Sequence, residues 1–172
     1  MNKFLFAVVV VLLCSASAQA QRDAGAKARG DFSFYARSGY SHVNAAHAHA
    51  SHYHGYLGQT GTVTPRIATL SDATLGHHLD LAQQHSTAMR EYFTATEDAD
   101  SITTLDTIDR HLSEAREHHA AAQAAVKQSP QTPQQAQAHV GKLQDSLEQV
   151  MQGQKALIDK HGVEKPTKPL AE

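Results

Sequence analysis

Six histidines near the middle of the chain are arranged as a mirror image. The arrangement consists of His77, His78, His85, His111, His118 and His119. The spacings of the first three are repeated in reverse by the last three, and the mirror point is Asp98. A mirrored pattern brings its members together when the chain folds back at the mirror point, as in an antiparallel helical hairpin. Imidazole binds transition metals and changes its charge near neutral pH, so the pattern predicts a site with one of these properties.

Within each half of the mirror, successive histidines on one helix edge are seven residues apart. That spacing corresponds to about 10.5 Å along a helix axis, which is too long for two imidazoles to share one small ion. Each site must therefore take ligands from two helices. The predicted sites are the pairs His85 with His111 and His78 with His118, with His77 and His119 as further ligands. All-imidazole ligand sets suit Cu(II), Zn(II) or Ni(II).

The apolar residues independently predict the same hairpin. In an antiparallel coiled coil, seam position a of one helix packs in a layer with position d of the other, so the residue numbers in each layer keep a constant sum. In the predicted register the layers are Leu79 with Ala115, Ala82 with Leu112, Ser86 with Ile108 and Met89 with Leu105. The four histidines of the two predicted pairs then occupy position g, which flanks the seam. We expect these g positions to face each other across the hairpin.

Histidines on the first and last helices extend the pattern. His42 and His49 take position g on the first helix, and His139 takes it on the last. The lengths of the expected helices and loops place His139 and His49 at about the same level along the bundle axis. This predicts a second metal site between them. The segment 42–54 allows two interpretations. An extended strand would let its histidines chelate in pairs, whereas a helix, which its alanines favour, would separate them.

The heptad seams and the breaks between them predict an all-α protein. Glycine and proline interrupt the pattern between 58 and 65, prolines interrupt it again between 129 and 133, and the polar stretch 96–101 separates the helices of the hairpin. Four helices joined by short loops favour an antiparallel up-down-up-down four-helix bundle. The predicted helices cover about 41–58, 65–95, 101–128 and 133–161, within a bundle domain at 41–161 that follows a flexible leader at 21–40 and precedes a disordered tail at 162–172.

Residues 1–20 have the features of a secretory signal peptide. A positive start at Met1–Lys3 precedes the apolar run Phe4–Leu13, and small residues predict cleavage after Ala20. The expected location is the periplasm or the outside of the cell. Membrane insertion after cleavage is not expected, because the apolar run is short and no second one follows. Cys14 is the only cysteine and would leave with the signal, so the mature chain is expected to have no thiolate ligand.

Composition and motifs argue against several other functions. Fifteen Lys and Arg against seventeen Asp and Glu leave no basic stripe for nucleic acid. The sequence contains no Glu-x-x-His pair of the ferritin-like type, no His-Glu-x-x-His and no glycine-rich phosphate loop, so no enzyme activity is expected.

Two hypotheses for the function follow. The leading one is a His-rich helical protein that binds Cu, Zn or Ni ions for buffering, storage or delivery. The alternative is a structural, adaptor or chaperone-like bundle without metal, responsive to pH through its histidines. Self-association through the helices is compatible with both.

Overall fold

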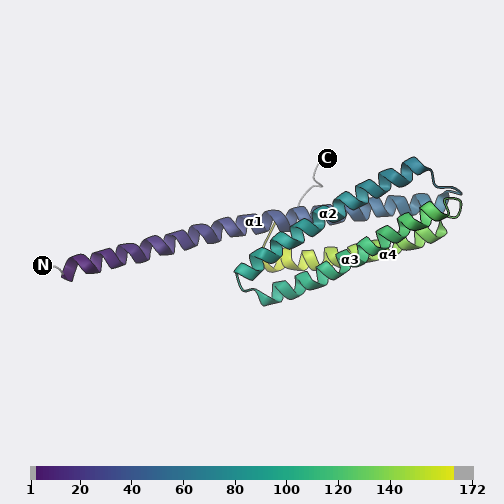
Figure 1. Cartoon of the computed structure of the whole chain (residues 1–172). Coiled ribbons are helices and arrows are strands. Elements are labelled where there is room, and N and C mark those ends of the chain that lie inside the picture. Colours follow the sequence, from purple (N-terminus) through teal and green to yellow (C-terminus); the bar gives the residue numbers. More distant parts are fainter. Residues whose placement is uncertain (1–2, 165–172) are drawn as a thin grey trace.

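The chain forms four helices that pack as one bundle (Figure 1). The computed structural model describes the backbone of residues 3–164 and the side chains of residues 31–164. The helices are α1 (Lys3–Gln59), α2 (Pro65–Ala95), α3 (Ala99–Gln128) and α4 (Gln134–Lys160). Each helix packs against the next one in the chain, and α4 closes the ring against α1. This confirms the predicted antiparallel four-helix bundle.

The helix boundaries follow from local sequence signals. Thr64 is extended, and Pro65 follows it at the first helical position of α2, where a missing N–H costs nothing. The side chain of Asp98 caps α3 by accepting a hydrogen bond from the backbone N–H of Ser101. α4 begins after Pro133. The predicted bounds of α2 are confirmed, and those of α3 and α4 differ from the structure by one or two residues.

The flexible leader predicted at 21–40 is wrong, because these residues continue α1. Phe32 is only 2% exposed, and its ring centre lies 5.1 Å from that of Tyr92 and 5.0 Å from that of Phe93. Gly39 permits a close approach, since a Cβ there would lie 3.2 Å from His85 Cβ. This packing outweighs the low helix propensity of the glycines in the segment. The segment 42–54 is also helical, which decides between its two interpretations.

The apolar seams form the core. All eight side chains of the predicted α2–α3 layers are at most 1% exposed. Polar contacts beside them fix the register, since Ser86 Oγ donates to Asp109 Oδ1 at 2.6 Å and Arg116 Nη1 lies 2.8 Å from Asp80 Oδ1. Ser86 therefore lies beside Ile108, as predicted. Within the described part of the chain, no helix has the length and apolar character needed to span a membrane.

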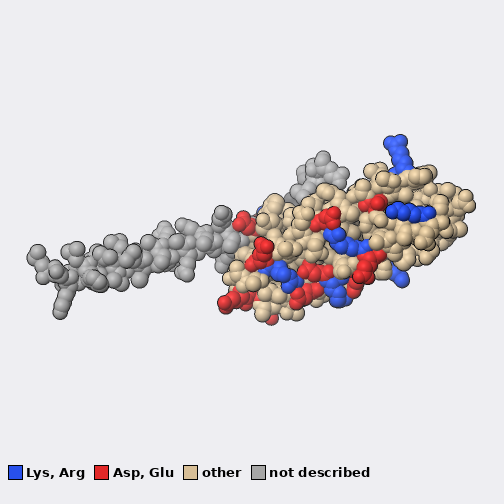
Figure 2. Space-filling model, viewed as in Figure 1, with Lys and Arg blue, Asp and Glu red and all other residues tan. Residues whose placement is uncertain are grey.

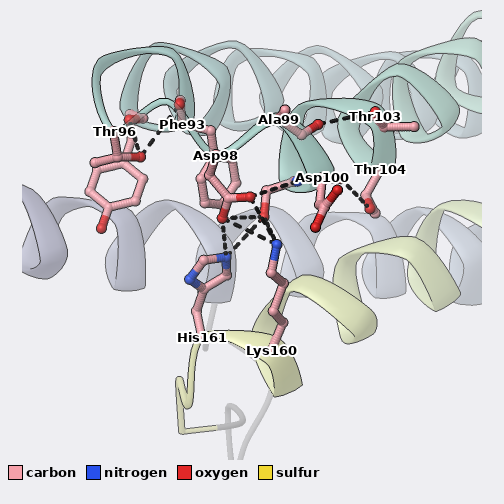
Figure 3. A network of polar contacts seen from close by, with 11 residues as sticks. Phe93, Thr96, Asp98, Ala99, Asp100, Thr103, Thr104, Lys160 and His161 are labelled. Carbon is pink, nitrogen blue, oxygen red and sulfur yellow. Dashed lines mark hydrogen bonds and ion pairs between the residues drawn. The ribbon is translucent and has the colours of Figure 1, made fainter.

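Asp98, the mirror point, holds together the end of the bundle that contains the α2–α3 turn (Figure 3). Its carboxylate accepts hydrogen bonds from Ser101 and, at 2.9 and 3.2 Å, from Lys160 Nζ at the end of α4. His161 Nε2 lies 3.0 Å from Ser101 Oγ and 3.4 Å from Asp98 Oδ2. The hydrogen bonds from Lys160 and Ser101 lower the pKa of Asp98 to about 2. The predicted disorder of the tail concerns residues 162–172, of which 165–172 lie outside the described residues.

Candidate functional site

The structure pairs the histidines of α2 with those of α1. The ring centre of His42 lies 5.5 Å from those of His78 and His85. The ring of His49 stacks on that of His78, also with centres 5.5 Å apart. The predicted pairing of His85 with His111 and of His78 with His118 is therefore wrong.

The predicted pairs do not form because of the order of the helices around the bundle. In an antiparallel bundle each helix turns its g edge to one neighbour and its e edge to the other, and the a and d layers are satisfied whichever neighbour is on which side. In this structure the g edges meet at the α1–α2 and α3–α4 contacts. The e edges of α2 and α3 face each other instead, as the hydrogen bonds from Gln83 and Arg90 to Asp109 show.

Four histidines form a continuous row, here called the histidine ladder: His85, His42, His78 and His49. Its rungs alternate between α2 and α1. The planes of His42 and His85 differ by 12°, and those of His49 and His78 by 17°. At the centre of the ladder, His42 Nδ1 and His78 Nδ1 are 3.3 Å apart. Histidine rings from two helices thus meet, between α1 and α2.

Burial and aromatic contacts define the surroundings of the ladder. His78 is 7% exposed, and the other rungs are half-buried. Tyr35 covers one end, with its ring centre 5.8 Å from that of His85. The pKa of His42 is lowered by burial and then by the neighbouring His77. The pKa of His85 is lowered by burial and then by His42. Both shifts favour the neutral imidazole, which is the form that ligates metals.

A second histidine contact joins α3 to α4. The ring centres of His118 and His139 are 6.0 Å apart, and His139 Nδ1 is buried without a hydrogen bond among the described residues. The predicted site between His49 and His139 is wrong, because His49 belongs to the α1–α2 contact. The same change in helix order accounts for this error.

The remaining predicted ligands lie elsewhere. His77 is exposed beside His78, with ring centres 5.6 Å apart. His111 Nδ1 lies 2.7 Å from Glu114 Oε2 on its own helix. His119 Nε2 lies 3.0 Å from Asp72 Oδ1 of α2. Neither His111 nor His119 joins the ladder.

The donor set of the ladder suits an imidazole-binding metal ion in part. Two nitrogens bound at 2.0–2.1 Å to one tetrahedral ion are about 3.3 Å apart, which matches the separation between His42 and His78. Among the described residues, no group of three or more His, Cys, Asp or Glu side chains is arranged to hold an ion. The ladder therefore offers two placed ligands, with His49 and His85 as the nearest further imidazoles.

His42 is the rung that the predicted ligand set omitted. The available signal was its position g, seven residues before His49, which repeats the spacing of His78 and His85. No protein-family model, curated protein or solved structure matches this chain, so the site geometry alone carries the functional argument.

Proposed function

We propose that this protein binds a transition-metal ion, Cu(II), Zn(II) or Ni(II), at the histidine ladder between α1 and α2. The observation that carries the proposal is the 3.3 Å separation of His42 Nδ1 and His78 Nδ1. The protein acts as a non-catalytic metal buffer, store or delivery protein in the periplasm or outside the cell. Because the sequence has no cysteine after residue 14, imidazole is the main transition-metal donor available.

The architecture supports reversible binding. A cross-helix site links α1 to α2, so the ion binds the folded bundle and stabilises it by mass action. Two protein ligands leave room for water or for a neighbouring rung, and such an incomplete set favours exchange of the ion over permanent retention. Protons compete with the metal for imidazole nitrogens, so binding weakens in acid.

Thermal unfolding of the purified protein with each of the three metals tests the proposal. At a free metal concentration of about 100 times the dissociation constant, we expect about 2.7 kcal/mol of added stability. The double variant His42→Ala/His78→Ala should lose most of this gain. His52→Ala is the matched control, since His52 is an exposed histidine on the same helix, and it should respond to metal as the wild type does.

A structural or adaptor bundle without metal is the second candidate. It is favoured by the finding that the described residues contain no group of three placed ligands. Melting temperatures that none of the three ions changes would support it and overturn the metal proposal. A metal response retained in His42→Ala/His78→Ala and lost in His118→Ala/His139→Ala would assign the site to the α3–α4 contact instead.

A further inference from the structure

A cavity of about 300 Å³ opens between α2 and α3, at the end of the bundle opposite the Asp98 turn. The two loops at this end are tied together, because the backbone N–H of Val63 donates to Pro130 O at 2.8 Å. Tyr53, Leu75 and Val140 are buried side chains at the base of the cavity. Its rim contains exposed residues such as Pro65 and Thr69 of α2. The cavity thus has an apolar floor and an opening to solvent.

The carboxylate of Asp72 lines this cavity. Its side chain is 37% exposed, but Oδ1 is buried, lies 3.0 Å from His119 Nε2 and accepts no hydrogen bond from any other described residue. A carboxylate oxygen with one imidazole contact keeps a lone pair for a further donor. A bound molecule can supply that donor.

The charges around the cavity indicate what kind of donor it accepts. The pKa of Tyr53 is raised by burial, then by Tyr56 and then by Asp72. The Asp72 carboxylate therefore interacts electrostatically with Tyr53 at the base of the cavity. Lys127 also lines the cavity, but it is exposed to solvent. On the face drawn in Figure 2, most acidic side chains lie toward the α2–α3 turn, and the charged side chains nearer the loop end are mainly Lys and Arg. Asp72 is therefore the carboxylate placed to select a ligand.

We propose that this cavity binds a small amphipathic amine, whose apolar body contacts the floor while its ammonium group donates to Asp72. Small-molecule sites combine such an apolar lining with a few placed polar groups. An ammonium makes a charge-assisted hydrogen bond to a carboxylate, which is stronger than the bond from a neutral hydroxyl. The cavity lies on the α2–α3 side of the bundle, so this site is independent of the histidine ladder.

An NMR titration of the isotope-labelled protein with three ligands of one shape tests the proposal. The ligands are 2-phenylethylamine, 2-phenylethanol and 3-phenylpropanoate, which present an ammonium, a hydroxyl and a carboxylate. We expect the amine to bind most tightly, the alcohol more weakly and the acid least, with shifts centred on Leu75, Ala122 and Val126. Equal affinities, tighter binding of the acid, or shifts elsewhere would overturn the proposal.

Two variants assign the roles of the carboxylate and the cavity. Asp72→Asn keeps the size of the side chain and should weaken amine binding about tenfold or more, with little effect on the alcohol. Asp100→Asn removes the same charge at the far end of the bundle and should change neither. Ala68→Phe fills the cavity and should abolish binding of all three ligands, with a thermal melt to verify folding. An amine affinity unchanged by Asp72→Asn would show that Asp72 does not recognise the ligand.

Discussion

The two edges of α2 contact their neighbouring helices through different kinds of side chain. Toward α1, the g edge presents His85, which stacks on the imidazole of His42, and His78, whose ring is tilted against the same imidazole. Toward α3, the e edge presents Arg90, which donates to Asp109 Oδ2 at 2.7 Å. One edge is thus built from imidazole rings in contact and the other from directed ionic hydrogen bonds.

The difference separates the contact that fixes the register of α2 from the contact that presents histidines. Asp109 accepts hydrogen bonds from Gln83, Ser86 and Arg90, and these contacts are lost if α2 slides along α3. Stacked rings impose a weaker geometric constraint on the register than these directed hydrogen bonds do. The α2–α3 contact therefore fixes the register, and the α1–α2 contact is free to carry function.

The largest expected effect comes from removing the central acid of the α2–α3 contact. Asp109→Ala leaves the hydroxyl of Ser86, which is fully buried, without its acceptor, and deprives Arg90 of its closest carboxylate. We expect a loss of about 2–3 kcal/mol in the free energy of unfolding, measured by urea denaturation.

Asp106→Ala provides the control for this variant. Asp106 also pairs with Arg90, at 2.8 Å, but its side chain is 63% exposed, against 28% for Asp109. An exposed ion pair contributes little, so the loss should stay below about 1 kcal/mol. Equal losses in the two variants would show that burial does not distinguish these acids.

A smaller, pH-dependent effect is expected at the turn that joins α2 to α3. The pKa of Asp98 is lowered from 3.8 to about 2, mainly by Lys160 and Ser101. The folded state therefore holds this proton less tightly than the unfolded chain does. The stabilisation is complete well above pH 3.8 and is lost as the pH falls toward 2.

Asp98→Asn tests this window directly. The variant should lose about 1 kcal/mol near neutral pH, typical of a weakened helix cap, and its stability should fall less steeply than that of the wild type between about pH 4 and pH 2. Urea denaturation at several pH values measures both slopes. Parallel slopes in the two proteins would contradict the assigned role of the carboxylate.

Much of the fold could be predicted because short-range signals and the apolar period agree. Thr64 and Pro65 mark the start of α2, and the buried layers from Leu79 to Met89 fix its register against α3. The burial of Phe32 was harder to predict, since its partners Tyr92 and Phe93 are distant in the sequence and the glycines nearby favour an irregular chain.

The candidate site shows where sequence reasoning ends. The spacing of His78 and His85 predicted contacts with histidines of another helix, and such ring contacts are present. The choice between α1 and α3 as the partner depends on the order of the helices around the ring. That order is decided by packing of all four helices together, and no heptad pattern of a single hairpin contains it.

The smallest expected effect on stability is at the ladder itself. His42→Leu/His78→Leu replaces both members of a contact by apolar side chains, and removing both partners of a buried polar pair is often nearly neutral. We expect the metal-free variant to unfold within about 1 kcal/mol of the wild type in urea, while any metal-induced stabilisation disappears. A loss as large as that of Asp109→Ala would mean that the histidines hold α1 on α2, and that both edges of α2 are structural.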